Sequence, residues 1–433
     1  MRANRIIAGA VFFLASGSAT AEVGDALLLA RIKSHMRGEL SRVTNYTCLE
    51  TTARFHKEPG RHAKIQPFDT VWLEVAYANH HEWYGSPGDR SLTQDNPVAF
   101  IGSGMIGNGF FEITLNNIFI GEGAAFTWRG EETLGGRTAY RYDFRLPRRF
   151  GELTVSIVGG IGTVGEQGSF WVNPQTLDLI RVEARADEIP PFLPLGEMSL
   201  SVDYARTRIG EYGVLLAQDA DLHMLKVAGE ENYNHLEYTH CRAFSAESAI
   251  RFDSEPSEPP QASPPGSPKT LSAPNAISQA VPSLLLVTVE LTTAITDQDA
   301  VGALIQGKVL GDVLRKGKIV IQNGALVRGR IRRLERFEKG GAFVVGLEFT
   351  EVEAGGGSSL PFYADLLRLD KTPGIQRILS ERALVPYRGG VESREEKITL
   401  PELPGVASFF VRGKTLTVPN GFRMVWRTRG LIR

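Results

Sequence analysis

SEPSEPPQASPPGSPKTLSAPNAISQAVP, residues 254–282, divides the chain into two parts. This stretch holds eight of the 23 prolines, six serines and no aromatic residue. A segment of this composition buries too little apolar surface to offset the entropy lost on ordering, so we expect a disordered, extended linker. The sequence therefore predicts two folded domains, at residues 22–253 and 283–433.

The composition outside this linker is that of ordinary folded domains. Hydrophobic residues make up 42% of the 433 residues and charged residues 22%, which is enough apolar material for two cores. The formal net charge of −1 gives no overall field that attracts nucleic acid or an anionic membrane. The 46 glycines indicate many turns, and many turns suit short strands better than long helices.

Residues 1–21 have the pattern of an export signal. Arg2 and Arg5 give a positive start, residues 6–15 form an apolar run, and residues 19–21 (Ala-Thr-Ala) match a small-x-small cleavage site. The apolar run is short for a membrane span, which favours cleavage near Ala21 over an anchor. We expect a mature protein that is periplasmic or otherwise exported and has no transmembrane segment.

The chain has two cysteines, Cys48 and Cys241. Because an exported protein folds in an oxidising compartment, this pair predicts one disulfide. The alternative is two unpaired buried thiols. A bridge that closes so long a loop stabilises a domain by up to roughly 5 kcal/mol in the chain-entropy description.

Strand patterns fill most of the N-terminal domain. Asp25 can cap a helix in which Leu28, Ile32, Met36 and Leu40 share one face. Alternating residues then predict strands at 46–55, 71–77, 137–146, 153–157, 169–172, 179–184, 198–206, 215–225 and 233–244.

One amphipathic helix interrupts this series of strands. Phe111, Leu115, Ile118 and Phe119 recur at helical spacing and form one apolar stripe, which we expect to cover the sheet as a lid. The preceding residues 102–107 (Gly-Ser-Gly-Met-Ile-Gly) match GxGxxG after a possible strand at 98–101. The alternating strands and the export signal favour a flexible hinge over a dinucleotide site.

Two segments of this domain resemble a known family. They are Asn45-Tyr46-Thr47-Cys48-Leu49-Glu50-Thr51 and the aromatic strand and turn Gly168-Ser169-Phe170-Trp171-Val172-Asn173-Pro174-Gln175-Thr176-Leu177. In this order, after a signal and a helix, they are similar to the periplasmic lipoprotein carrier and lipoprotein-receptor (outer-membrane lipoprotein-sorting) superfamily. The resemblance implies a strongly curved, incomplete antiparallel barrel with helices that cover an apolar cavity for acyl chains.

Large apolar side chains are the candidates for lining such a cavity, because ligand cavities are lined by aromatic and aliphatic groups. The alternative is an ordinary core that these side chains fill themselves. The candidates are the aromatic residues Trp72, Trp128, Tyr140 and Trp171 and the lid residues Phe111, Leu115, Ile118 and Phe119.

Catalytic and metal-binding motifs are weak or absent in the sequence. His80, His81 and Glu82 form one candidate metal set, and His235, His240 and Cys241 form another. On a strand, His240 points away from His235 and Cys241, so surface histidines are the better interpretation. The G-x-S-x-G nucleophile motif does not occur. We therefore expect no enzyme, no metal site and no cofactor.

The C-terminal domain shows short strand patterns at the spacing of a small barrel or sandwich. Residues 317–330, in which Gly324-Ala325-Leu326-Val327-Arg328-Gly329 follows a turn, resemble the C-terminal barrel of type IV secretion and conjugation scaffold proteins. This resemblance implies a barrel that contacts an envelope protein partner. Five arginines at 328–336 alternate with apolar residues, which favours a solvated sheet face over an anion-binding one.

These observations predict a mainly β (α+β) protein of a bacterial envelope. The predicted order is a curved antiparallel half-barrel with covering helices, the linker, and a second small β-barrel or sandwich. Two functions remain open: a binder of an acyl chain or lipoprotein, or a structural module whose interior is filled. No nucleic-acid partner is expected.

Overall fold

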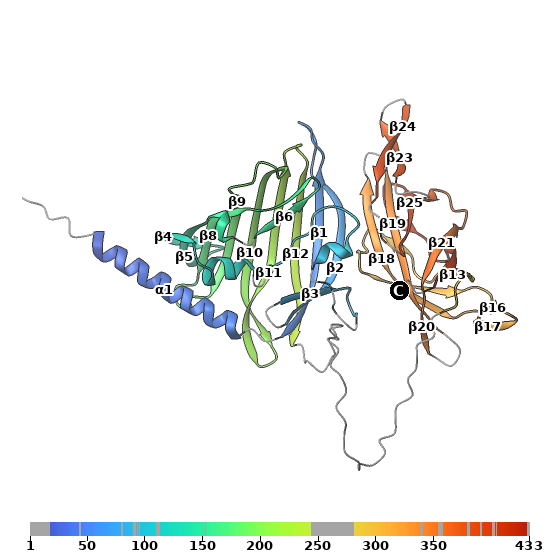
Figure 1. Cartoon of the computed structure of the whole chain (residues 1–433), viewed down its shortest axis with the longest axis horizontal. Coiled ribbons are helices and arrows are strands. Elements are labelled where there is room, and N and C mark those ends of the chain that lie inside the picture. The colour runs from blue at the N-terminus through green and yellow to red at the C-terminus, as the bar shows by residue number, and fades with distance from the viewer. Residues whose placement is uncertain are drawn as a thin grey trace, which may run out of the picture.

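The structure is a computed structural model that describes residues 18–42, 45–78, 81–89, 92, 94, 96–109, 113–151, 153–243, 281–337, 341–353, 358–378, 382–389, 392–400, 403 and 405–430. It confirms the predicted fold class: a curved antiparallel sheet with covering helices and a second, barrel-like sheet lie side by side (Figure 1). Most of the predicted signal peptide, and the predicted linker up to residue 280, lie outside the described residues, so the domain boundaries stay predictions.

The first sheet has ten strands, all paired in antiparallel fashion. They are β1 (Tyr46–Lys57), β2 (Gln66–Ala78), β3 (His81–Gly85), β4 (Ala125–Leu134), β5 (Arg137–Leu146), β8 (Gly165–Val172), β9 (Leu179–Asp187), β10 (Leu195–Ile209), β11 (Tyr212–Lys226) and β12 (Glu231–Ala243). Their order is β3-β2-β1-β12-β11-β10-β9-β8-β5-β4. The pair β1–β12 therefore joins the two ends of this domain's sequence.

A separate hairpin of β6 (Thr154–Ile157) and β7 (Gly160–Thr163) lies between β5 and β8 in the chain, after the short 3-10 helix η3 (Arg148–Phe150). The strands predicted in this domain are confirmed, while β3, β4 and β7 had no predicted counterpart. The possible strand at 98–101 is wrong, because residues 97–100 form the 3-10 helix η1 (Pro97–Phe100).

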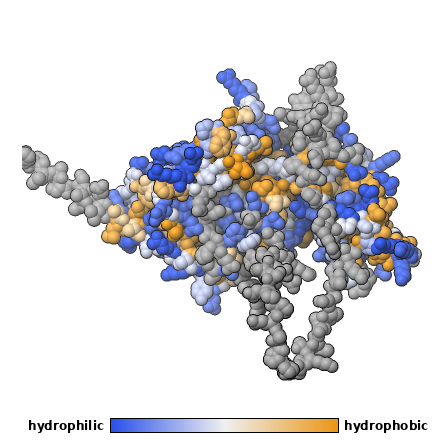
Figure 2. Space-filling view, in the orientation of Figure 1, coloured by the Kyte–Doolittle hydropathy of each residue, from blue (hydrophilic) through white to orange (hydrophobic). Residues whose placement is uncertain are grey.

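One face of the sheet carries the core and is called the inner face. Directly opposed residues on six adjacent strands form a fully buried row: Val182, Val202, Ala220, Leu236, Thr52 and Val71. Successive residues of a strand point to opposite faces, so the outer face carries their polar neighbours, such as Arg181 and Asp203. Hydrophilic and hydrophobic residues are interspersed over both sheets on the side of the molecule in Figure 2.

Helix α1 (Ser18–Arg42) packs on the inner face through the buried residues Ile32 and Met36. The predicted apolar face of this helix is confirmed, although the helix begins at Ser18 and not at Asp25. The predicted lid helix is present as a short α-helical turn, α2 (Ile113–Leu115), that runs into a π-helical turn, η2 (Asn116–Ile120). Among the described residues, no helix has both the length and the apolar composition that a membrane crossing requires.

The predicted disulfide is confirmed. Cys48 on β1 is bonded to Cys241 on β12, and the two residues are 193 positions apart in sequence. The bridge lies at the strand pair that joins the two ends of the domain's sequence. It therefore fixes the longest-range pairing of the sheet.

The second sheet is nearly closed. Its strands are β13 (Leu286–Leu291), β15 (Leu304–Val309), β18 (Leu326–Phe337), β19 (Ala342–Glu353), β20 (Ser359–Pro361), β21 (Ala364–Leu369), β22 (Ile375–Arg377), β25 (Ala407–Arg412) and β27 (Arg423–Thr428). They run in the order β21-β27-β13-β15-β18-β19-β25-β22, and β20 pairs with β19. The two end strands meet where an Arg377 Nη1–H donates to the Leu367 carbonyl (2.6 Å), and Trp426 is buried in the interior.

Three two-stranded ribbons complete this part of the chain. β14 (Ile295–Thr296) pairs with β26 (Thr417–Val418), β16 (Val313–Arg315) with β17 (Lys318–Ile321), and β23 (Arg382–Gly389) with β24 (Glu392–Thr399). The last of these ribbons extends beyond the sheet in Figure 1.

The second unit docks on a free edge of β2. Strand β3 pairs with β2 only from Glu74 to Ala78, so the edge before Glu74 is left open. Val301 fills it: the Trp72 N–H donates to the Val301 carbonyl (2.8 Å), and the Val301 N–H donates to the Thr70 carbonyl (2.8 Å). These bonds satisfy backbone groups that an open sheet edge exposes. Gly302 permits the approach, because a Cβ there would lie 2.4 Å from the Trp72 carbonyl oxygen.

Four buried charged side chains, here called the interface charge cluster, lie where the two units meet. Arg54 of β1 binds Asp69 of β2 through two hydrogen bonds of 2.6 Å, and their side chains are only 2% and 1% exposed. Arg333 and Glu335 of β18 are equally buried, and burial raises the pKa of Glu335. The cluster holds two cations and two anions, so its formal charges balance.

A β-bulge turns Arg333 and Glu335 toward the first unit. The register of β18 against β19 shifts between Ile331 and Arg333. Ile331 and Leu334 therefore both face the barrel core, and Arg333 and Glu335 lie on the opposite face. The solvated sheet face predicted for the arginines is wrong for Arg333.

Two neighbouring arginines also contact the first unit. Arg330 forms an ion pair with Asp89 (2.7 Å), and an Arg332 Nη2–H donates to the Ala99 carbonyl (3.3 Å). The arginine-rich part of β18 therefore serves as the docking face of the second unit.

Candidate functional site

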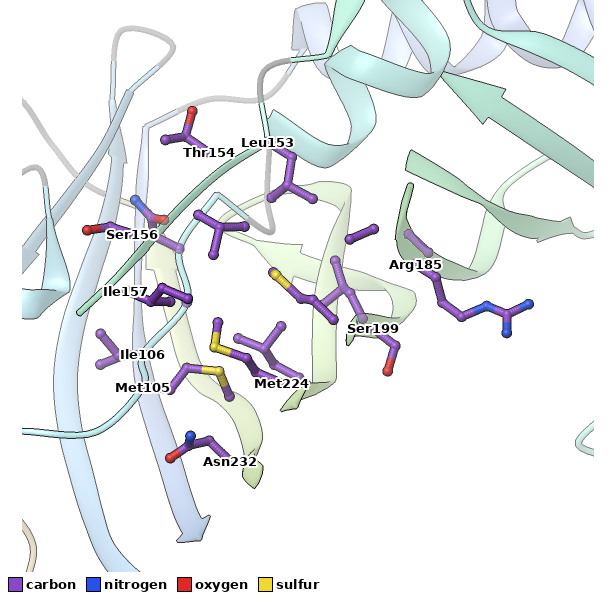
Figure 3. Close-up of a pocket in the computed structure, with 18 of the residues that line it drawn as sticks. Met105, Ile106, Leu153, Thr154, Ser156, Ile157, Arg185, Ser199, Met224 and Asn232 are labelled. Carbon is purple, nitrogen blue, oxygen red and sulfur yellow. The ribbon is translucent and has the colours of Figure 1, made fainter. Parts of the chain in front are cut away.

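A cavity of about 560 Å³ opens on the inner face of the first sheet. This volume is typical of ligand pockets, which span roughly 300–1,000 Å³. The wall is formed by residues of segment 96–108, by Thr114 and Asn117 of the covering turn, by residues 153–158 and by strands β8 to β12 (Figure 3). Its apolar residues include Met105, Ile106, Leu153, Val155, Ile157, Met198, Leu200, Leu222 and Met224.

Three methionines from separate elements meet in this wall: Met105, Met198 and Met224. Met198 of β10 stands directly opposite Met224 of β11, and Met105 approaches them from the loop in front of the sheet (Figure 3). The methionine side chain is unbranched and polarisable, so it adjusts to irregular apolar partners. This part of the wall is therefore suited to apolar groups of varied shape.

The loop that carries Met105 is held from two sides. From the first sheet, Arg54 Nη1–H donates to the Ser103 carbonyl (2.6 Å) and Asn234 Nδ2–H to the Met105 carbonyl (2.9 Å). From the second unit, Glu335 lies so close to Gly102 that a Cβ there would be 2.4 Å from its carboxylate oxygen. The interface charge cluster therefore sets the position of one cavity wall.

Acidic residues occur at two places in the cavity wall. Glu166 of β8 is 3% exposed, accepts a hydrogen bond from Asn117 of η2 (3.2 Å), and has its pKa raised by burial. At the second place Lys226 forms an ion pair with Glu230 (2.8 Å). Burial of Glu230 favours a higher pKa, but the hydrogen bonds from Lys226 and Asn232 outweigh burial, so the pKa of Glu230 is lowered.

Exposed apolar side chains surround part of the cavity. Val158, at the turn of the β6–β7 hairpin, lines the cavity and is 94% exposed. Ile161, Phe192 and Val227 are also exposed, and Phe192 lies next to Gly162 of the same hairpin. Together these four residues form an apolar rim.

The predicted lid residues lie beside the cavity and not in its wall. Leu115, Ile118 and Phe119 are buried in the main core, and the Phe119 ring meets Phe170 edge-on at 5.0 Å. Side chains therefore fill the space beneath this turn. Phe111 lies outside the described residues.

The other predicted ligand-binding residues fall on both faces of the sheet. Trp128 contacts Tyr140 (5.4 Å) in an aromatic cluster on the inner face. Trp171 lies on the outer face, where Arg141 stacks over its ring (5.3 Å). Trp72 also lies on the outer face and packs partly against the core. None of these four lines the cavity. Sequence reasoning missed three residues of the cavity wall, Met105, Met198 and Met224. Met198 and Met224 belong to the inner-face positions of their strands, and Met105 lies inside the GxGxxG stretch.

Among the residues that the structure describes, two groups of acidic and histidine side chains come close enough to hold a metal ion. In the first, His35, Glu39 and Asp178 surround Arg206, which is 2.6 Å from Asp178 and 3.1 Å from Glu39. A guanidinium therefore takes the place that a cation would need.

The second group is His235 with Asp219 and Glu237 on the outer face of the sheet. His235 Nδ1 lies 2.8 Å from Asp221, and this hydrogen bond raises the pKa of His235. A partly exposed histidine among carboxylates needs no metal to explain it. Of the predicted metal sets, His81 packs against the Trp83 ring (4.7 Å) and His80 lies outside the described residues.

A further buried carboxylate, Glu50, lies on the inner face outside the cavity wall. Glu50 accepts a hydrogen bond from Thr52 (2.8 Å), and burial, reinforced by the nearby charge of Glu82, raises its pKa to about 7. Tyr84 donates to Glu82 (2.5 Å). This group is enclosed in the core and is not part of the cavity wall.

Replacing Glu50 by glutamine is expected to flatten the pH dependence of stability. The folded state holds a proton on Glu50 up to about pH 7, whereas the unfolded chain releases it near pH ~4.3. The free energy of unfolding therefore falls by up to about 3 kcal/mol between these two values as pH rises. Urea unfolding across this range measures it. The exposed Glu131→Gln variant should keep the slope, and a Glu50→Gln variant that also keeps it would contradict the assignment.

The fold and the cavity together define a class: a half-barrel of antiparallel strands whose helix-covered inner face holds an apolar cavity. No protein-family model matches the sequence, and no curated protein matches it. Among solved structures, the chain is similar to a domain from Vibrio parahaemolyticus described as an outer membrane lipoprotein-sorting protein, with 9% identity and a TM-score of 0.25 over 49% of this chain and 92% of that one.

It is also similar to a LolA superfamily protein from Nitrosomonas europaea, with 9% identity and a TM-score of 0.25 over 50% of this chain and 94% of that one. At such a TM-score the likeness carries no argument about function. The strand order and the cavity described above stand on their own. The predicted resemblance of the C-terminal domain to secretion scaffold barrels stays a prediction.

Proposed function

We propose that this protein is an exported, non-enzymatic protein of the cell envelope that binds an apolar ligand, an acyl chain or a lipoprotein, in the first sheet. The observation that carries the proposal is the cavity of about 560 Å³ lined by three methionines and aliphatic side chains. Moving apolar ligand surface from water into such a site is favourable by about 25 cal/mol per Å².

The apolar rim supports the same proposal. Val158, Ile161, Phe192 and Val227 leave large apolar side chains in water beside the cavity. Exposed apolar patches of this kind mark ligand-binding grooves or contact surfaces. An acyl chain that enters the cavity would contact these side chains and remove their apolar surface from water.

Export is supported by the signal pattern of residues 1–21 and by the Cys48–Cys241 bridge. Disulfides persist in oxidising compartments and are rare in the cytoplasm. The mature protein is proposed to begin after Ala21, and sequencing of the N-terminus of the secreted protein tests this.

The substitution Met198→Trp is expected to block ligand binding. Met198 is part of the cavity wall, so the larger indole side chain would occupy volume that a ligand needs. Displacement of a fluorescent naphthylamine probe by palmitate measures the affinity of the full mature chain. We expect Met198→Trp to weaken binding by more than about tenfold. Met198→Leu preserves the side-chain volume and should bind as the wild type does. Equal affinity of all three proteins would overturn the proposal.

A structural module is the second candidate function. The filled packing beneath Leu115, Ile118 and Phe119 favours it, because the covering turn serves there as part of the core. In that case the wild type would bind neither probe nor palmitate, and mass spectrometry of an organic extract would find no lipid.

A further inference from the structure

Glu166 is a nearly inaccessible acidic residue in the cavity wall. It lies on β8 directly opposite Ala186 of β9 and Leu146 of β5, which are inner-face residues. Only 3% of Glu166 is exposed, and the residue lines the cavity. Its side chain therefore lies on the cavity side of the sheet.

Within the described part of the chain, one side chain donates a hydrogen bond to Glu166. Asn117 Nδ2–H donates to Glu166 Oε1 (3.2 Å), whereas a carboxylate has about four acceptor positions. Among the described residues, no arginine or lysine forms an ion pair with Glu166. Of the cations near the wall, Lys226 is bound to Glu230, and the Arg185 side chain points away from the methionines (Figure 3).

An acceptor with so few partners discriminates between ligands. Burying a polar group without hydrogen bonds is unfavourable. A hydrocarbon chain that fills the cavity offers Glu166 no hydrogen-bond donor. A ligand with a carboxylate end would in addition bring a like charge to the site. A ligand with an N–H or O–H group would supply the missing donor.

We propose that Glu166, positioned by Asn117, is the specificity-determining group of the cavity. It selects an amphiphile whose polar end donates hydrogen bonds, a long-chain amine or alcohol, over one that ends in a carboxylate. This inference rests on the proposed function, because it assumes that the cavity takes an apolar chain.

The test compares three amphiphiles with the same chain: dodecylamine, dodecanol and dodecanoate. Each displaces the naphthylamine probe from the full mature protein. A charge-assisted hydrogen bond to Glu166 should make dodecylamine bind at least about tenfold tighter than dodecanoate, with dodecanol in between. Glu166→Gln should reduce this preference by about tenfold. The matched control Glu131→Gln removes an exposed carboxylate outside the cavity wall and should keep the order of the three ligands.

The outcomes separate the two proposals. Tighter binding of dodecanoate than of dodecylamine by the wild type overturns the role of Glu166 and leaves the apolar-ligand function standing. The same holds if Glu166→Gln, shown by circular dichroism to be folded, keeps the wild-type order. Failure of the wild type to bind any of the three overturns the proposed function and this inference with it. The wild-type order needs no variant, so the test does not depend on whether Glu166→Gln folds.

Discussion

An Arg54→Met variant is expected to lose about 3–5 kcal/mol of unfolding free energy. The substitution leaves Asp69, whose side chain is 1% exposed, buried without its counter-charge. It also removes the donor to the Ser103 carbonyl. A buried charge without a partner cannot recover its hydration, so the loss exceeds that of a surface ion pair. Urea or guanidinium unfolding of the full mature chain measures it.

The outer face of the same sheet supplies a matched control. Arg181 binds Asp203 through two hydrogen bonds of 2.6 Å, the same lengths as in the Arg54–Asp69 pair. The side chains of Arg181 and Asp203, however, are 31% and 37% exposed. We expect Arg181→Met to lower the free energy of unfolding by no more than about 1 kcal/mol. The double variant Arg54→Met/Asp69→Leu should regain most of the lost stability, since no charge is left unpaired. Equal losses in both single variants would refute the role assigned to burial.

The same variant links the domain interface to the cavity. Arg54 binds Asp69, which lies beside Glu335 of the second unit, and also holds Ser103, two residues before Met105. If this loop is held less firmly, Met105 should no longer keep a fixed position in the cavity wall. The affinity for the naphthylamine probe should therefore fall in Arg54→Met and stay unchanged in Arg181→Met.

Periodicity predicted most of this fold. Alternating residues predicted a strand at 71–77, and the structure has β2 there, with Val71, Leu73 and Val75 on the buried face and Trp72 on the other. The helical spacing of Ile32 and Met36 likewise identified the buried face of α1. These signals are local, because a strand or helix that covers a core repeats its apolar residues at a fixed interval.

The candidate site was harder to predict because contacts between distant segments determine it. On β1 three of the buried inner-face residues, Glu50, Thr52 and Arg54, are polar, and partners such as Ser103 come from other segments of the chain. On β18 a one-residue bulge moves Arg333 into the interface, and a shift of one residue exchanges the two faces of a strand. The cavity wall at Met105 depends on both, so no local pattern could reveal it.

Removing the disulfide is expected to give the largest loss of stability. A Cys48→Ala/Cys241→Ala variant opens a loop of 193 residues, and the chain-entropy description gives a loss of about 5 kcal/mol for a loop of this length. The bridge joins β1 to β12, which also pair along their whole backbones. The folded sheet should therefore keep its strand order without the bridge, and the effect should arise mainly in the unfolded chain.

Folding and unfolding rates distinguish an effect on the unfolded chain from a loss of stabilising interactions in the folded sheet. If the bridge acts by confining the unfolded chain, the variant must first bring β1 and β12 together across the long loop, so refolding should slow while unfolding changes little. Stopped-flow refolding and unfolding in urea measure both rates. Reduced wild-type protein is the matched control, since it lacks the bridge without any substitution, and it should behave as the variant does. An unchanged refolding rate with much faster unfolding would show that the bridge stabilises the folded sheet directly.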